Sequence, residues 1–143
     1  MSIEDVNSTE GSSANKLLRI GLWIVQSALF VTFVMSGYLK LASPIAQLSA
    51  MMPWTGEFSE IFVRFIGLVD LAGGLGILLP ALTRILPQLG ILAASGITVL
   101  QVLAIVFHIS RGEYMVLPLN LVLLPLAVFA LWGRTRKAPI HPR

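Results

Sequence analysis

Four long apolar runs dominate the chain, at about residues 17–41, 59–82, 85–109 and 114–132. Each has roughly the 17–25 residues that an α-helix needs to cross the hydrocarbon core of a bilayer. Short turns with Pro, Gly and charged residues separate the last three runs, as at Arg111-Gly112-Glu113. The pattern predicts an all-α membrane protein in which residues 17–133 form an antiparallel bundle of four transmembrane helices.

The segments outside these runs differ in character. In the first loop, Ser43-Pro44 is typical of a helix start, and Ile45, Leu48 and Met52 then fall on one side at helical spacing. A short interfacial helix is therefore expected there. Residues 1–16 are polar and predict a disordered N-terminal tail, whereas residues 134–143 predict a basic cytoplasmic tail.

Composition supports a lipid environment and excludes several classes of function. Hydrophobic residues make up 56% of the 143 residues and charged residues 12%, and the mean hydropathy is +0.85. A soluble domain of this size could not bury so much apolar surface, so the lipid bilayer is the expected partner. The net charge of +3 is scattered without a basic face, which argues against nucleic acid. There is no cysteine, and His108 and His141 have no metal-ligand spacing, so neither a metal site nor a covalently bound cofactor is expected.

The distribution of cations predicts the orientation. Four spans would put both termini and the middle turn on one side of the membrane. That side holds seven cations, namely Lys16, Arg19, Arg84, Arg134, Arg136, Lys137 and Arg143. The opposite side holds three, namely Lys40, Arg64 and Arg111. Because short cytoplasmic segments carry the excess of Lys and Arg, both termini are predicted to be cytoplasmic.

Asp70 is the most informative residue inside a span. It lies six residues after Arg64, about 9 Å further along a helix axis. A carboxylate at that depth costs several kcal/mol unless it is paired, hydrogen-bonded or protonated. Gly67 and Gly74 lie on the same helix face and leave room for a partner. Asp70 is either a proton- or ligand-binding carboxylate or a structural acid that ties two helices together.

Other polar residues gather at the same level. Lys40 ends the first span, and its long side chain is predicted to reach Asp70 directly or through water; its alternative role is a snorkelling anchor. On the third span Gln101 and His108 are seven residues apart and share an inward stripe, roughly 10 Å from each other. His108 suits a proton shuttle or ligand partner, or an interfacial side chain that reaches water. The candidate ligand-binding residues are Lys40, Arg64, Asp70, Gln101 and His108, around a polar pocket that opens outward.

Three features resemble the DoxX-like family of small four-helix membrane proteins. They are Ser36-Gly37-Tyr38-Leu39-Lys40-Leu41, Gly67-Leu68-Val69-Asp70-Leu71-Ala72-Gly73-Gly74 and the third-span histidine His108. The similarity covers about residues 17–133, although the family usually has Glu at the position of Asp70. The resemblance implies a four-helix bundle in a bacterial inner membrane. It also implies a loose link to redox chemistry, because the family name comes from a subunit of a thiosulfate:quinone oxidoreductase.

Two functions of different classes follow. The first is a small membrane subunit that works with a redox partner and binds a quinone-like or small anionic ligand in the pocket. The second is a non-catalytic assembly, chaperone or interaction protein whose polar cluster is structural. A small-molecule transporter is a weaker third option, because four helices would have to dimerise to enclose a path. A second copy of the chain is a further candidate partner, in a homodimer.

The four-span topology predicts the result of reporter fusions. A fusion after Gly112 and a fusion after Arg136 should lie on opposite sides of the membrane, with the second one in the cytoplasm. Paired phosphatase and fluorescent-protein reporters measure this directly. Reporting from the same side by both fusions would overturn the four-span topology.

Overall fold

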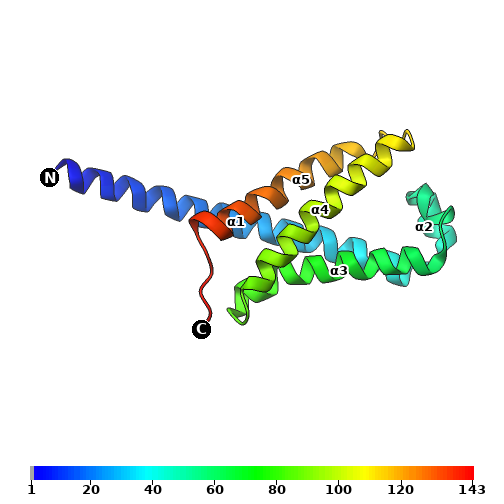
Figure 1. Cartoon of the computed structure of the whole chain (residues 1–143), viewed down its shortest axis with the longest axis horizontal. Helices are drawn as coiled ribbons and strands as arrows, with labels where there is room; N and C mark the ends of the chain where they lie inside the picture. The colour runs from blue at the N-terminus through cyan, green and yellow to red at the C-terminus, as the bar shows by residue number, and fades with distance from the viewer. Residues whose placement is uncertain (1) are drawn as a thin grey trace.

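The computed structural model describes residues 2–143, except for the side chains of residues 7–10. All of its regular structure is helical, and four long helices run antiparallel (Figure 1). The elements in order are α1 (Ile3–Ala42), α2 (Ile45–Met51), η1 (Pro53–Gly56), α3 (Glu60–Thr83), α4 (Gln88–Ser110), α5 (Leu117–Trp132) and η2 (Gly133–Lys137). The predicted fold class is therefore confirmed, including the short helix between the first two spans.

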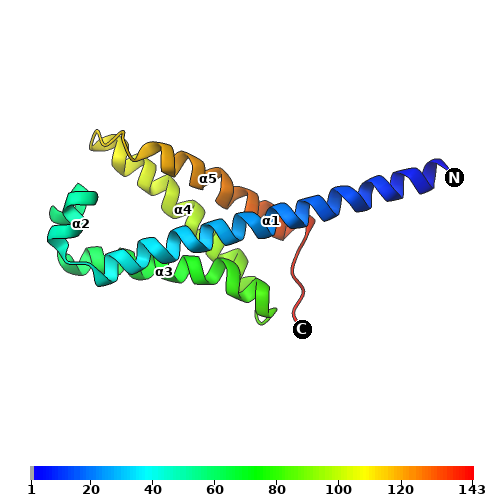
Figure 2. The same cartoon turned by 180° about the vertical axis from the view of Figure 1, so that it is seen from behind.

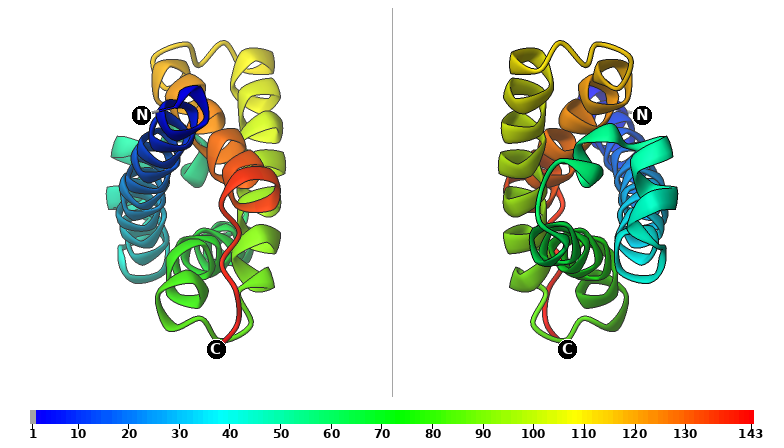
Figure 3. Two further views of the ribbon diagram at one scale, coloured as in Figure 1. Left: turned by 90° about the vertical axis from the view of Figure 1, so that its left-hand side faces the viewer. Right: turned by 90° about the vertical axis from the view of Figure 1, so that its right-hand side faces the viewer.

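The long helices pack in a closed ring. α1 packs most extensively on α3, α3 on α4, α4 on α5, and α5 returns to α1, as the end-on views show (Figure 3). The end of the ring with α2 and the α4–α5 turn is called the loop end. The opposite end, with the α3–α4 turn and the C-terminal segment, is called the terminal end (Figure 1).

α1 begins much earlier than the sequence pattern indicated. Residues 3–16 were expected to belong to a disordered tail, but they extend the first helix, which projects beyond the other helices (Figure 2). The helix starts with a capping box, in which the Ser2 Oγ accepts from the Asp5 backbone N–H at 3.2 Å. The Asp5 carboxylate in turn accepts from the Ser2 N–H at 3.0 Å. This reciprocal cap satisfies two of the backbone donors that a helix start leaves free.

Backbone geometry explains why other helices begin later than predicted. Arg84 and Leu86 have φ angles of 58° and 48°, which a right-handed helix cannot contain, so α4 starts at Gln88 rather than near residue 85. α5 starts at Leu117 with Pro118 in its first turn, where a missing N–H costs nothing. In the first loop Pro44 precedes α2 as its N-cap, instead of being its first helical residue.

The buried and exposed faces match a protein in lipid. The four long helical segments are long and apolar enough to cross a membrane, the last of them being Leu117–Lys137. The predicted inward stripe of α4 is confirmed, because Ala94 is 2% and Gln101 5% exposed, whereas Val106 on the opposite face is 61% exposed. The core between the helices consists of Leu29, Phe33, Ile77, Leu78, Ala94, Ile97, Leu123, Ala127 and Ala130.

The terminal end contains a buried arginine that the sequence analysis placed in a polar tail. Arg134 lies in η2 and is 7% exposed. Its Nε donates to the Gln26 Oε1 at 2.8 Å, its Nη1 donates to the Ala138 carbonyl at 2.9 Å, and its guanidinium lies 4.9 Å from the centre of the Trp23 ring. Gln26 donates in turn to the Ile77 carbonyl at 2.7 Å. The hydrogen bonds to Gln26 and Ala138 therefore offset part of the cost of burying the Arg134 guanidinium.

Glycines set the close approach of α1 and α3. A Cβ on Gly37 would lie 2.7 Å from the Gly67 carbonyl oxygen and 2.7 Å from the Leu71 backbone nitrogen. A Cβ on Gly74 would lie 2.9 Å from the Val34 backbone nitrogen. Because these neighbours are backbone atoms, they cannot move away without separating the helices. Glycine on both sides therefore brings the two backbones together.

Gly37→Ala should destabilise the protein by about 1–3 kcal/mol, because overpacking at a helix contact forces the backbones apart. Thermal unfolding in mild detergent measures the effect. Gly96→Ala on α4 is the matched control, since nothing lies within 4 Å of a Cβ at Gly96. The control should be neutral or stabilising by up to about 1 kcal/mol, because alanine favours helix more than glycine does. Equal stability of the two variants would contradict the close packing.

Candidate functional site

A buried ion pair joins α1 to α3. The Lys40 Nζ lies 2.6 Å from the Asp70 Oδ2, and the two side chains are 9% and 5% exposed. Ser36, one turn before Lys40, donates to the same carboxylate oxygen at 2.9 Å and accepts from the Lys40 Nζ at 2.6 Å. The predicted contact between Lys40 and Asp70 is confirmed as a direct one. Three groups in mutual hydrogen-bond contact offset much of the cost of removing the two charges from water.

Arg64 supports this pair from outside. Its Nη1 donates to the carbonyl oxygens of Lys40 and Ser43, both at 2.7 Å, and its Nη2 donates to Glu60 at 2.9 Å. The last carbonyls of a helix have no partner within the helix, so Arg64 satisfies acceptors at the end of α1. Arg64 does not line the cavity described below. Arg64 therefore links α3 to the end of α1 by hydrogen bonds.

A second set of polar side chains lies at the loop end. The His108 Nδ1 lies 3.4 Å from the Glu113 Oε1, which also accepts from the Arg111 Nε at 2.6 Å. Arg111 forms a further ion pair with Glu57 in the loop before α3. Burial opposes ionisation of Glu113, but hydrogen bonds from Arg111 and His108 outweigh it and hold the pKa of that carboxyl below its ordinary value. The hydrogen bond to Glu57 in turn raises the pKa of Arg111.

An aromatic cluster covers the same end. The Trp54 ring of η1 lies 6.3 Å, centroid to centroid, from the rings of Phe58, Phe62 and Phe107. The Arg111 guanidinium lies 5.3 Å from the centre of the Phe107 ring. The η1 turn is therefore held against both α3 and α4, over the space between the helices.

Beneath this cover lies a cavity of about 460 Å³. This volume falls within the range of small-molecule sites in proteins. Its lining is mostly apolar, with Phe33, Trp54, Phe62 and Phe107 among the walls. The polar side chains that line it are Thr32, Ser36, Lys40, Asp70, Gln101, His108, Glu113 and Asn120. Of the predicted ligand-binding residues, the structure brings Lys40, Asp70, Gln101 and His108 to one cavity.

Two amides of the cavity carry unsatisfied polar atoms. The Gln101 Oε1 and the Asn120 Nδ2 are buried and have no hydrogen-bond partner among the described residues, although both side chains line the same space. A buried polar atom without a partner costs about 1–3 kcal/mol, so such atoms are uncommon in folded proteins. An amide beside a cavity with an acceptor or a donor unused is suited to hydrogen-bond a ligand if its side chain turns towards that space.

Sequence reasoning missed part of the lining. Ser36 was assigned no role in the pocket from the sequence, although its position four residues before Lys40 placed both side chains on one helix face. For Asn120 the sequence favoured a helix-to-helix hydrogen bond over a role in the polar cluster. Glu113 had no signal in the pattern, because its contact with His108 depends on how the α4–α5 turn folds back. No group of three or more His, Cys, Asp or Glu residues among the described side chains could hold a metal ion.

The sequence model of the DoxX-like family matches residues 24–130. The chain belongs to the DoxX-like family. The matched residues contain the entire lining of the cavity, from Thr32 to Leu123, but not Arg19 or Arg134 at the terminal end. Comparison with curated proteins and with solved structures finds no match.

The coupling of Lys40 and Asp70 in this DoxX-like protein is testable with a double-mutant cycle. Asp70→Asn and Lys40→Met should each lower the unfolding free energy by about 3–5 kcal/mol, because each leaves the other group buried without its partner. The double variant should recover part of the loss, which thermal or denaturant unfolding in detergent would show. Strictly additive losses would mean that the two groups do not interact.

Proposed function

We propose that this DoxX-like protein is a small membrane subunit that binds a quinone-like ligand in the loop-end cavity and works with a redox partner. The observation that carries the proposal is that Gln101 and Asn120, which line a largely apolar cavity of about 460 Å³, each have a buried amide atom without a hydrogen-bond partner among the described residues. An apolar ring with oxygen atoms at its edge fits such a lining.

The charges around the cavity favour a neutral ligand over a small anion. Lys40 is already paired with Asp70, and Arg111 is paired with Glu57 and Glu113. An anion would have to compete with these carboxylates for each cation. The amides, in contrast, have free hydrogen-bonding capacity. Because an amide presents either its oxygen or its NH₂ group, it serves the carbonyl of a quinone and the hydroxyl of a quinol equally well.

His108 gives the site an imidazole that can donate or accept a hydrogen bond. It lines the cavity and contacts Glu113, which connects through Arg111 to the exposed Glu57. In the proposal, His108 hydrogen-bonds the ligand oxygen, and its contact with Glu113 orients the imidazole ring. Electrons would be exchanged with a partner protein that carries its own redox cofactor. The family link to a quinone-reducing enzyme supports this assignment.

We further propose that the loop end faces outward and the terminal end faces the cytoplasm of a bacterial inner membrane. The support is the excess of cations at the terminal end, seven against three, together with the family resemblance. The cavity would then open towards the outer leaflet, where a lipid-soluble ligand is available.

Substitution of the two amides separates a binding role from a structural one. Gln101→Leu and Asn120→Leu should leave the unfolding free energy of the ligand-free protein unchanged or up to about 1 kcal/mol higher, because each removes an unsatisfied buried atom. The same variants should bind a short-chain ubiquinone analogue roughly three- to tenfold more weakly, because each loses a hydrogen bond to the ligand. Ligand-dependent melting in mild detergent measures both quantities.

Gln47→Leu is the matched control, since Gln47 is exposed on α2 and does not line the cavity. It should leave quinone binding unchanged. Lower stability of Gln101→Leu with unaltered quinone binding would show that the amide serves packing alone. That result, with stoichiometric recovery of another membrane protein, would favour the assembly function instead.

A further inference from the structure

The cations at the two ends of the bundle differ in their partners. At the loop end each cation has a carboxylate at ion-pair distance, in the pairs Lys40–Asp70, Arg64–Glu60 and Arg111–Glu57. At the terminal end no ion pair joins any of the seven cations to a carboxylate within the side chains that the structure describes. The chain also has no acidic residue between Glu10 and Glu57, or after Glu113. The carboxylates of this end, Glu4, Asp5 and Glu10, are fewer than its seven cations, so this end carries net positive charge.

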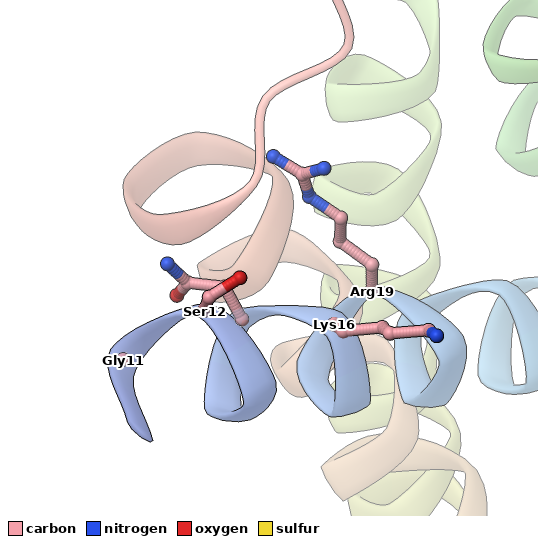
Figure 4. Close-up of a pocket in the computed structure, with 5 residues that line it drawn as sticks. Gly11, Ser12, Lys16 and Arg19 are labelled. Atoms are coloured by element: carbon pink, nitrogen blue, oxygen red, sulfur yellow. The ribbon is translucent and has the colours of Figure 1, made fainter. Parts of the chain in front are cut away.

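A groove of about 640 Å³ lies on α1 at this end (Figure 4). It is lined by Gly11, Ser12, Asn15, Lys16 and Arg19, which follow one another along one face of the helix. Four of these side chains carry hydrogen-bond donors, and none is acidic. Hydroxyl, amide, ammonium and guanidinium donors without a competing carboxylate are typical of sites for phosphate.

Arg134 adds to this positive potential. Its Nε and Nη1 donate to neutral oxygen atoms, and its Nη2 is buried without a partner among the described residues. Arg19 is close enough for its charge to act on the Arg134 guanidinium. The two guanidinium groups therefore repel each other. An anion bound at Arg19 would replace part of this repulsion at Arg134 with attraction.

The level of the groove along α1 indicates which anion would reach it. The first apolar run begins at Leu17, so Lys16 and Arg19 lie where α1 enters the hydrocarbon core. That level contains the phosphate groups of the lipids. The groove also lies outside the residues that match the family.

We propose that this groove binds the phosphate of an anionic phospholipid, through Lys16 and Arg19 with Ser12 and Asn15 as neutral donors. The site is independent of the quinone-like ligand at the loop end. It fixes the level of α1 at the membrane surface and neutralises the charge around Arg134.

The test uses the full chain in mild neutral detergent with added phosphatidylglycerol, phosphatidylcholine or inorganic phosphate. Native mass spectrometry counts bound lipid, and thermal melting measures its effect on stability. Phosphatidylglycerol should bind and raise the melting temperature, whereas phosphatidylcholine and inorganic phosphate at the same concentration should not. The double variant Lys16→Gln/Arg19→Gln should bind phosphatidylglycerol roughly tenfold or more weakly, since each cation near the surface contributes on the order of 1 kcal/mol.

The control Arg136→Gln/Lys137→Gln removes the same charge from exposed positions of η2. It should lose less than about threefold in affinity, as expected for general attraction alone. Equal losses in the two double variants would overturn the proposal, because they would show diffuse attraction without a site. Equal stabilisation by inorganic phosphate would overturn the lipid as the source of the phosphate group.

Two further measurements concern the variant itself. Lys16 and Arg19 are exposed, so helical circular dichroism should be unchanged in the Lys16→Gln/Arg19→Gln variant. A single Arg19→Lys variant, which keeps the charge, should retain most of the binding.

Discussion

An ammonium and a carboxylate inside a membrane protein stabilise each other when they meet, because either one alone would have to leave water without that compensation. In this chain the Lys40 Nζ and the Asp70 Oδ2 meet at 2.6 Å, with Ser36 in contact with both. The backbones of α1 and α3 also lie close to each other beside this contact. Gly37, Gly67 and Gly74 remove the side chains that would otherwise hold the two helices apart.

The rest of the loop end follows from this close pair. Since α1 and α3 form one compact wall, α4 and α5 close the ring opposite them and leave a cavity between the two walls. One wall carries charges that are already paired, and the other carries the amides of Gln101 and Asn120 with atoms that are not. The aromatic cluster around Trp54 covers part of the space at the loop end. Such a division between satisfied charges and free amides suits a neutral ligand.

The cations at the two ends of the bundle have different kinds of partner. At the loop end carboxylates of the chain itself pair with the cations, and this local neutrality allows them to lie beside an apolar cavity. At the terminal end Arg134 is buried against Gln26, Ala138 and the face of Trp23, all of which are neutral. Neutral acceptors satisfy hydrogen bonds but do not cancel the charge of the guanidinium.

The sequence alone determined the class of the fold and the depth of the main polar groups. Hydrophobic run lengths define four spans because the bilayer has a set thickness, and the cost of a lone buried charge made a partner for Asp70 necessary. Helical periodicity placed Gln101 and His108 on the inward face of α4. Only the tertiary structure decided that Arg64 clamps the end of α1 instead of lining the cavity, and that Arg134 is buried instead of lying in a tail. Those outcomes depend on how helices distant in sequence approach one another and how turns fold back, and periodicity within a single helix contains no information about either.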